Sequence, residues 1–365
     1  MKKKRLLMVL GVVCLALIVA ALPFIAACAK PAPPPPAPVP APKPAPKPVE
    51  WRMVSGVEGT GGYACGTALS KLITDNVPGL TVYVEAARAA AGMRYVSRGE
   101  VEICYTSPYI LRAGYTGTDP FHEKPLGEVK PYQGYWFYPI QLYFVVRADS
   151  DMHTWDDMAG HKITTWRVAT GIAPPMRDLL KAMGLWDKVD HKYVEEKLGA
   201  DALSSGTVDA VMGWSIANQQ IKAMVDIDAR VKCRVLTMSE EQKKFITEFP
   251  GVSFIEAAPE SAFKTQDIGL AKLPGVGIWY GYPYAPFADP DLAYQAVKAI
   301  FEHVDAMREI SKLYHLWASD PKGTQISGIS AIPDIPVHPG IARYYKEIGI
   351  WQPSWKEGKI VPRPK

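Results

Sequence analysis

Apolar and polar positions from residue 51 onward follow the order typical of strand–helix–strand units. Trp51–Val57 alternates as a strand, and Tyr63–Asp75 carries apolar residues at helical spacing. Strands are predicted next over Leu80–Glu85 and Val101–Thr106, with a helix over Ala89–Ser97 between them. Strands that alternate with helices at this spacing indicate βαβ units and a parallel sheet.

A second series of the same kind follows the long apolar strand predicted over Ile140–Arg147. Trp155–Thr164 predicts a short helix, a glycine turn and a strand, and Pro175–Met183 predicts a further helix. One pattern, in which a helix ends at a glycine and an acidic residue opens an apolar strand, occurs at Tyr95–Ile103 and again at Ala202–Met212. Two weakly similar series predict an α/β protein with two lobes and a cleft between them.

The last part of the chain predicts a return to the first lobe. Gly275–Tyr282 is predicted as a strand that crosses back, Asp291–Met307 as an amphipathic helix, and Ile341–Ile348 as the last helix. Two crossings between lobes suit hinge closure around a ligand. We expect the first lobe to comprise residues 51–143 and 275–365, including the C-terminal helix and tail, and the second to comprise 144–274.

The composition is that of a globular protein. The 365 residues are 48% hydrophobic and 21% charged, enough for two domains of roughly 100–200 residues each. These values exclude a disordered chain and a protein that spans a membrane many times, and five cysteines are too few for a disulfide scaffold. Cys65, Cys104 and Cys233 follow no metal-binding spacing, so we expect them to be small buried hydrophobic residues.

The N-terminal residues predict export and a lipid anchor. Basic residues Lys2–Arg5 precede an apolar run, Leu6–Leu22, whose 17 residues are fewer than the ~20 of a spanning helix and fit a signal peptide. The segment Ile25–Cys28 resembles the bacterial lipobox, whose cysteine is acylated before the preceding peptide is removed. We expect residues 1–27 to be a lipoprotein signal peptide and Cys28 to carry the lipid. A plain signal peptide with a chance cysteine, or an uncleaved anchor, is the alternative.

Residues 28–50 are expected to tether the folded part to the lipid. Pro31–Pro48 holds 11 prolines in 18 residues, typical of a polyproline II helix of roughly 55 Å. The chain carries 41 Lys and Arg against 37 Asp and Glu, and the excess of four lies in the signal peptide. The remainder is formally neutral, which disfavours a nucleic acid and leaves a small anionic solute, held by local groups, as the expected partner.

The glycine-rich loop after the first strand is a candidate anion site. Its residues Gly59, Thr60, Gly61 and Gly62 stand where a strand ends and a helix begins. Backbone N–H groups and the helix dipole can therefore face an anion, with the Tyr63 hydroxyl beside them. A plain tight turn is the alternative.

The same loop has the form of a dinucleotide fingerprint, Gly59-x-Gly61-x-x-Ala64, with acidic Glu85 at the next strand end. A Rossmann-type enzyme is therefore a second alternative. Export disfavours it, and no His–Asp or Tyr-x-x-x-Lys arrangement lies near a cleft position.

Two arginines are candidates for holding a carboxylate. Arg88 and Arg167 lie at equivalent turns of the two lobes, where closure would bring both near one ligand, and Thr170 shares the second turn. A guanidinium binds a carboxylate through two parallel hydrogen bonds, which are strong in a desolvated cleft. A solvated surface position is the alternative for each arginine.

Further candidates lie at strand ends, which face the crevice in open α/β sheets. They are Tyr105, Thr106, Ser107 and Tyr109 in the first lobe, and Trp214 and Ser215 in the second. Trp136, Trp166 and Trp279 point to an aromatic or larger apolar acid, although core packing is the more frequent role of a tryptophan.

Sequence motifs of catalysis and metal binding do not occur. The chain contains no His-Glu-x-x-His, Cys-x-x-Cys, Gly-x-Ser-x-Gly or Walker pattern. His303 and His315 lie in predicted helices, where a structural role is expected. We expect no catalytic residue, no metal and no cofactor.

The order of several segments resembles the TAXI family of TRAP-transporter solute-binding proteins over roughly residues 51–350. The matching segments are Gly59–Gly66, Val77–Leu80, Trp155–Lys162, Gly206–Ala210 and, most specific, Val337–Tyr345. The resemblance implies a type II-like periplasmic-binding-protein fold with two crossings. It also implies delivery of a small organic acid or amino acid to an ion-coupled membrane permease.

Members of that family mostly bind glutamate-like amino acids or dicarboxylates. Two turns of this chain differ from the family pattern, Ala86–Gly92 and Trp166–Pro174, where Arg and Trp replace small polar residues. Glutamate is therefore not carried over as the ligand.

Together these observations predict an extracytoplasmic solute-binding protein, anchored by a lipid to a bacterial cell membrane. It closes on a small anionic solute (an amino acid, a dicarboxylate or an aromatic acid) and passes it to a TRAP permease subunit. A surface lipoprotein or antigen that keeps the fold without transport is the alternative.

Replacing Cys28 tests the anchor. Cys28→Ala removes the thiol that is acylated, so we expect the protein to lose its lipid and its membrane association, measured by fractionation and intact mass. Cys14→Ala, within the predicted signal peptide, is the control and should stay membrane-bound. Unchanged membrane retention of Cys28→Ala would contradict the lipobox assignment.

Overall fold

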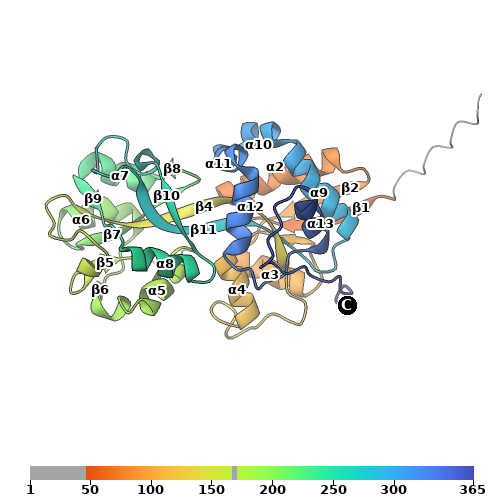
Figure 1. The fold of residues 1–365 in the computed structure, drawn as a ribbon, viewed down its shortest axis with the longest axis horizontal. Coiled ribbons are helices and arrows are strands. Elements are labelled where there is room, and N and C mark those ends of the chain that lie inside the picture. Colours follow the sequence, from red (N-terminus) through yellow and green to blue (C-terminus); the bar gives the residue numbers. More distant parts are fainter. Residues whose placement is uncertain (1–46, 167–170) are drawn as a thin grey trace, which may run out of the picture. The chain divides into compact units, whose positions relative to one another are not determined.

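Two long strands, β4 (Tyr132–Arg147) and β11 (Leu273–Tyr284), form the middle of one 11-stranded sheet in the computed structural model (Figure 1). The structure describes residues 47–166 and 171–365, so the predicted signal peptide and Cys28 lie outside the described residues. The other strands are β1 (Val49–Val54), β2 (Leu80–Glu85), β3 (Ile103–Cys104), β5 (Lys162–Thr164), β6 (Asp190–His191), β7 (Ala210–Ile216), β8 (Gln219–Gln220), β9 (Cys233–Val235) and β10 (Ser253–Ala257).

The helices fall into two groups along the chain. Those before β4 and after β11 are α2 (Gly61–Asn76), α3 (Ala89–Ser97), α4 (Pro108–Thr116), α9 (Pro290–Glu302), α10 (Val304–Ile310), α11 (His315–Ser319), α12 (Pro321–Ser330) and α13 (Pro339–Glu347). Those between the two strands are α5 (Ala173–Ala182), α6 (Gly199–Ser204), α7 (Lys222–Arg230) and α8 (Glu240–Glu248). We call the two groups, with their strands, the first half and the second half, and we call β4 and β11 the joining strands.

The sheet has the order β2-β1-β3-β11-β4-β7-β5-β6, with β10 beside β11, β8 beside β7 and β9 beside β4 (Figure 1). Strand β1 pairs in parallel with β2 and β3, and β5 pairs in parallel with β6 and β7. The joining strands are antiparallel to each other, and β4 is also antiparallel to β7. The predicted α/β architecture, with parallel units in both halves and two crossings, is confirmed.

Local signals explain where most helices begin. Asp289 caps α9, because its carboxylate accepts hydrogen bonds from the N–H groups of Asp291 and Leu292 at 2.8 and 3.0 Å, and Pro290 follows at the first helical position. The predicted helix Asp291–Met307 is wrong in its length. It breaks at His303 (φ −117°, ψ 40°), whose Nδ1 lies 2.8 Å from the Ala299 carbonyl oxygen, where it can donate to that end of α9.

The predicted strand Val101–Thr106 is shorter than expected. Only Ile103 and Cys104 pair with β1 as strand residues, and next to them the carboxylate of Glu102 accepts the N–H of Arg52 at 2.7 Å. The Glu102 side chain is 4% exposed and also pairs with Arg363 of the C-terminal tail. A buried carboxylate needs such partners, so this one fastens the end of the chain to the first half.

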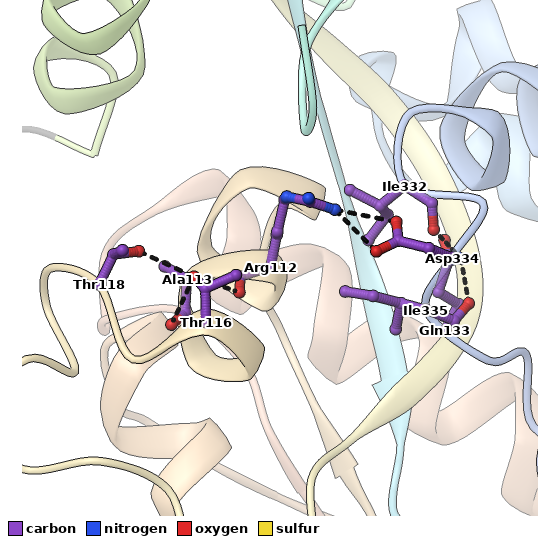
Figure 2. Close-up of polar contacts among 8 residues, drawn as sticks. All are labelled: Arg112, Ala113, Thr116, Thr118, Gln133, Ile332, Asp334 and Ile335. Atoms are coloured by element: carbon purple, nitrogen blue, oxygen red, sulfur yellow. Dashed lines mark hydrogen bonds and ion pairs between the residues drawn. The ribbon is translucent and has the colours of Figure 1, made fainter.

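Figure 2 shows a second set of polar contacts that links distant parts of the first half. Arg112 of α4 pairs with Asp334, with 2.9 Å between Nη1 and Oδ2. Beside it, the side-chain amide of Gln133 in β4 donates to the carbonyl oxygens of Ile332 and Ile335 at 3.0 and 2.8 Å. The loop between α12 and α13 is thereby held against both α4 and β4.

Buried side chains form two hydrophobic clusters, one in each half. Ile216 and Tyr280, both partly exposed, pack against both clusters. Cys65, Cys104 and Cys233 are buried free thiols. None of the helices in the described ranges combines the length and apolar composition that crossing a membrane requires.

The buried His338 makes folding sensitive to pH. Its Nε2 lies 3.2 Å from the Ala288 carbonyl oxygen, which requires that nitrogen to carry the proton, and no described residue pairs with its buried Nδ1. Burial lowers the pKa of His338 from 6.5 to about 4, because a second N–H and a charge would have no partner there.

The unfolded chain binds a proton at this histidine near pH 6.5, whereas the folded chain binds it only near pH 4. The folded state is therefore fully stable above pH 6.5, and this part of its stability is lost as the pH falls to the folded pKa. A lowering from 6.5 to about 4 corresponds to about 3 kcal/mol. We expect the free energy of unfolding in urea to fall between pH 6.5 and 4, and His338→Gln, which can still donate to Ala288, to flatten that slope. An equal slope in the variant would contradict this role.

Candidate functional site

A pocket of about 790 Å³ is lined by residues of both halves and both joining strands. The first half contributes two loops that follow β1 and β2, the start of α4, and the turn at Asp119. The second half contributes the start of α5 and the end of β7. The joining strands form the back wall with Tyr138, Ile140 and Tyr280.

The loop after β1 brings the start of α2 to the pocket. Thr60 caps this helix, since its hydroxyl accepts the N–H of Tyr63 at 3.3 Å, and Gly61 and Gly62 line the pocket with their backbone. A Cβ on Gly62 would lie 3.0 Å from the Tyr105 ring, so glycine lets that ring pack on the helix start. The first turn of a helix has N–H groups without intrahelical partners, which favours an anion here.

The loop after β2 adds the start of α3 and a cation. Arg88 is the N-cap residue of α3 but makes no capping hydrogen bond with its side chain, and Ala89 and Ala90 follow it along the pocket. Among the described residues Arg88 has no ion pair or hydrogen-bonded side-chain partner. Its exposed guanidinium is therefore available to a ligand.

The start of α5 brings a second cation, Arg177, which is already paired. Its Nε lies 2.9 Å from Asp178 Oδ1, and the other Asp178 oxygen accepts the hydroxyl of Tyr109 in α4. Burial lowers and the bond to Asp178 raises the pKa of Arg177, with a net rise, so it stays charged. Burial and then the bond to Asp178 raise the pKa of Tyr109, which stays a donor. This group ties the two halves together at the edge of the pocket.

Three tyrosines make an aromatic wall. The rings of Tyr105 and Tyr280 are 5.4 Å apart between centroids at 26°, and those of Tyr138 and Tyr280 are 6.1 Å apart at 19°. The hydroxyls of Tyr105 and Tyr138 are hydrogen-bonded at 2.7 Å. Burial raises the pKa of Tyr280 to about 12, so its hydroxyl stays protonated.

A β-bulge in the joining strands sets this wall. Tyr280 pairs with Tyr138, but the next residue, Gly281, pairs with Trp136, so Phe137 is the extra residue. In β11 every residue except Tyr280 is buried. The bulge changes the alternation of side chains at the point where Tyr138 and Tyr280 reach the pocket.

Trp214 lines the opposite side. Its indole N–H donates to Glu196 Oε1 at 2.7 Å. Burial raises the pKa of Glu196, and the bond from Trp214 lowers it in part. Because this N–H is occupied, Trp214 offers a ligand its ring surface only.

Several residues predicted from the sequence lie at the pocket, and others do not. Thr60, Gly61, Gly62, Arg88 and Trp214 line it, as does Tyr105. Gly59, Tyr63, Thr106, Ser107 and Ser215 are absent from its lining, and Arg167 and Thr170 lie outside the described residues.

The residues that do not line the pocket have other roles. Thr106 is buried and donates to the Met93 sulfur at 3.7 Å, and Ser107 caps α4 by accepting the N–H of Ile110. Ser215 is buried in β7, opposite Gln141. Gly59 has a φ of +79°, the left-handed turn conformation that favours glycine.

The tryptophans offered from the sequence as an aromatic pocket wall lie elsewhere. Trp136, Trp166 and Trp279 are buried in the two clusters. Sequence reasoning missed Tyr138, Tyr280, Asp119 and Arg177. A signal for the first two was present, since each stands in a continuous apolar strand that spans both halves.

Glu85, the acidic residue of the dinucleotide fingerprint, is exposed and lies 3.5 Å from Arg52. It does not line the pocket. Within residues 47–166 and 171–365, no three or more His, Cys, Asp or Glu side chains lie close enough together to hold a metal ion.

The sequence profile of the NMT1-like family matches residues 54–349. The chain belongs to this family. Among solved structures, it is similar to the periplasmic aliphatic sulphonate binding protein SsuA from Escherichia coli, at 15% identity over 83% of this chain and 84% of that one, with a TM-score of 0.40. It is also similar to substrate binding domain 2 of GlnP from Lactococcus lactis, in an open conformation, at 14% identity over 74% of this chain and 96% of that one, with a TM-score of 0.40.

Glycine at position 281 keeps the joining strands together beside the pocket. A Cβ there would lie 2.2 Å from the Tyr135 carbonyl oxygen and 2.7 Å from the Trp136 Cα, which are backbone atoms that cannot move aside easily. We expect Gly281→Ala to lower the free energy of unfolding in urea by about 1–3 kcal/mol.

Gly127→Ala is the matched control. The tightest contact of a Cβ there is with the Ser97 hydroxyl oxygen, at 3.1 Å, and a small side-chain adjustment relieves it, while the nearest backbone atom is 3.9 Å away. Equal unfolding free energies for the two variants would show that the bulge tolerates a side chain.

Proposed function

We propose that the protein is an extracytoplasmic solute-binding protein that captures a small organic acid in this pocket. One observation carries the proposal. The starts of α2 and α3, together with the guanidinium of Arg88, which pairs with no described residue, meet at a single cavity that both halves line. Helix N-termini and a free guanidinium are the groups that hold a carboxylate best.

Binding from both halves also explains how the solute would be enclosed. A ligand that contacts the first half at Arg88 and the second half at Trp214 stabilises the arrangement in which both are near it. Ligand affinity and closure are then one equilibrium.

Binding fits this lining better than catalysis does. Its titratable groups among the described residues are Arg88, Arg177, Asp119 and the three wall tyrosines. Burial raises the pKa of each of these tyrosines, so they stay protonated and neutral. No cysteine, histidine, serine or lysine, the usual nucleophiles and bases, lines the described part of the pocket.

Transport completes the proposal. The N-terminal sequence supports export and a lipid on Cys28, and the order of segments that resembles TAXI proteins supports a TRAP-type permease as the receiver of the solute. Membership of the NMT1-like family agrees with a role in solute binding and does not separate one transporter type from another.

Arg88 is the most direct test. Arg88→Gln removes the charge that would pair with a carboxylate, so binding of an anionic ligand should weaken by about 1.5 kcal/mol or more, at least about tenfold. Isothermal titration calorimetry measures the loss. Arg52→Gln is the control, since Arg52 pairs with Glu85 and does not line the pocket.

Thermal unfolding with a panel of amino acids, keto acids, dicarboxylates and aromatic acids distinguishes transport from the surface-lipoprotein alternative. A ligand at 100 times its Kd adds about 2.7 kcal/mol to stability. If no acid raises the melting temperature, the solute-binding proposal fails. Full affinity in Arg88→Gln would instead remove Arg88 from the site.

A further inference from the structure

The charges of the pocket favour a ligand with one negative charge. Arg88 and Arg177 supply two cations, but Arg177 is paired with Asp178 at 2.9 Å, and Asp119 adds a carboxylate to the lining. Arg88 is therefore the cation without a partner in the described part of the lining. A second carboxylate on the ligand would share the pocket with Asp119 and would find no unpaired cation among those residues.

Most polar groups of the wall already have a partner. One of the Tyr105 and Tyr138 hydroxyls donates to the other, and the Trp214 N–H donates to Glu196. Most of the other side chains are apolar, among them Ile110, Ile140 and Ile216. A ligand rich in polar groups would bury them without partners, which is costly.

Tyr280 is the exception. Its hydroxyl makes no hydrogen bond with any described residue, and a Cβ placed on Gly171 would lie 3.3 Å from it. It can therefore bond to one polar substituent at the end of the ligand on the second-half side.

The aromatic composition of the wall favours an aromatic ligand. Tyr280 stacks on Tyr105 and on Tyr138, at 26° and 19° between ring planes, and all three rings line the pocket. Aromatic rings gain from offset stacking and edge contacts beyond the apolar area that they bury. Aliphatic groups of the same size lack this additional gain and contribute only their apolar area.

We propose that the pocket selects an aromatic monocarboxylate, with its carboxylate at Arg88 and its ring against Tyr105, Tyr138 and Tyr280. This inference rests on the proposed solute-binding function and names its substrate class. It separates this protein from relatives that take dicarboxylates or glutamate-like amino acids.

Calorimetry on the full-length protein purified in detergent tests the class. The probes are benzoate, phenylacetate, 4-hydroxyphenylacetate and 3-phenylpropionate, with cyclohexylacetate, succinate and L-glutamate for comparison. We expect the best aromatic acid to bind about tenfold or more tightly than cyclohexylacetate, which has the same charge and similar size, and than either polar acid.

Variants of Tyr280 locate the effect. Tyr280→Leu should weaken the best aromatic acid by about fivefold or more and leave cyclohexylacetate within about twofold, whereas Tyr280→Phe should keep the stacking and lose only the preference for the 4-hydroxyl group. Tyr83→Leu, at an exposed tyrosine of β2 that does not line the pocket, is the matched control. Circular dichroism checks that each variant is folded.

The outcomes separate the two proposals. If succinate or L-glutamate binds more tightly than every aromatic acid, and Arg88→Gln weakens it, the aromatic class is overturned while solute binding stands. Equal affinities for phenylacetate and cyclohexylacetate would likewise overturn the aromatic class while solute binding stands. If no acid binds, both proposals fail.

Discussion

The antiparallel pairing of β4 with β11 is the constraint on which the other parts of the molecule depend. Every residue of β4 except the first and the last is buried, and both strands contribute side chains to the cores of both halves. Each large buried side chain stabilises the fold by roughly 1.5–3 kcal/mol. The back wall of the pocket thus belongs to the most deeply buried backbone, whereas the remaining lining comes from loops and helix starts.

This combination of a buried back wall and a lining of loops suits the binding role proposed for the pocket. Tyr138 and Tyr280 are fixed by strand pairing and by a bulge that a side chain on Gly281 would disturb. Arg88, by contrast, stands at a helix start, and no described residue holds its side chain by a hydrogen bond. The pocket combines a rigid apolar surface with a charge that can adjust its position to the ligand.

Much of the fold could be predicted from the sequence, because periodicity reports which side of an element is buried. The parallel units and the return strand followed from it, and so did Thr60, Gly61, Gly62, Arg88 and Trp214 as residues near strand ends. Tyr105 was also a candidate at a strand end, but Tyr138 and Tyr280 could not be placed at the pocket from the sequence, since a single extra residue, Phe137, shifts the alternation of β4.

Local chemistry explains the other differences. His303 breaks a helix whose apolar face continues across it, and beside the short strand β3 the Glu102 carboxylate accepts the N–H of Arg52. Such effects depend on one side chain finding one partner, which a pattern of apolar positions does not record. The paired state of Arg177 is of the same kind, because Asp178 and Tyr109 come together only in the folded chain.

The joining strands also determine where the backbone passes between the halves. The chain enters the second half along β4 and leaves it along β11, and the two paths are hydrogen-bonded neighbours, with Leu142 opposite Val276 and Ile140 opposite Ile278. Both passages of the backbone therefore lie at one paired junction, and a change in the β4–β11 register would move the two ends of the second half together.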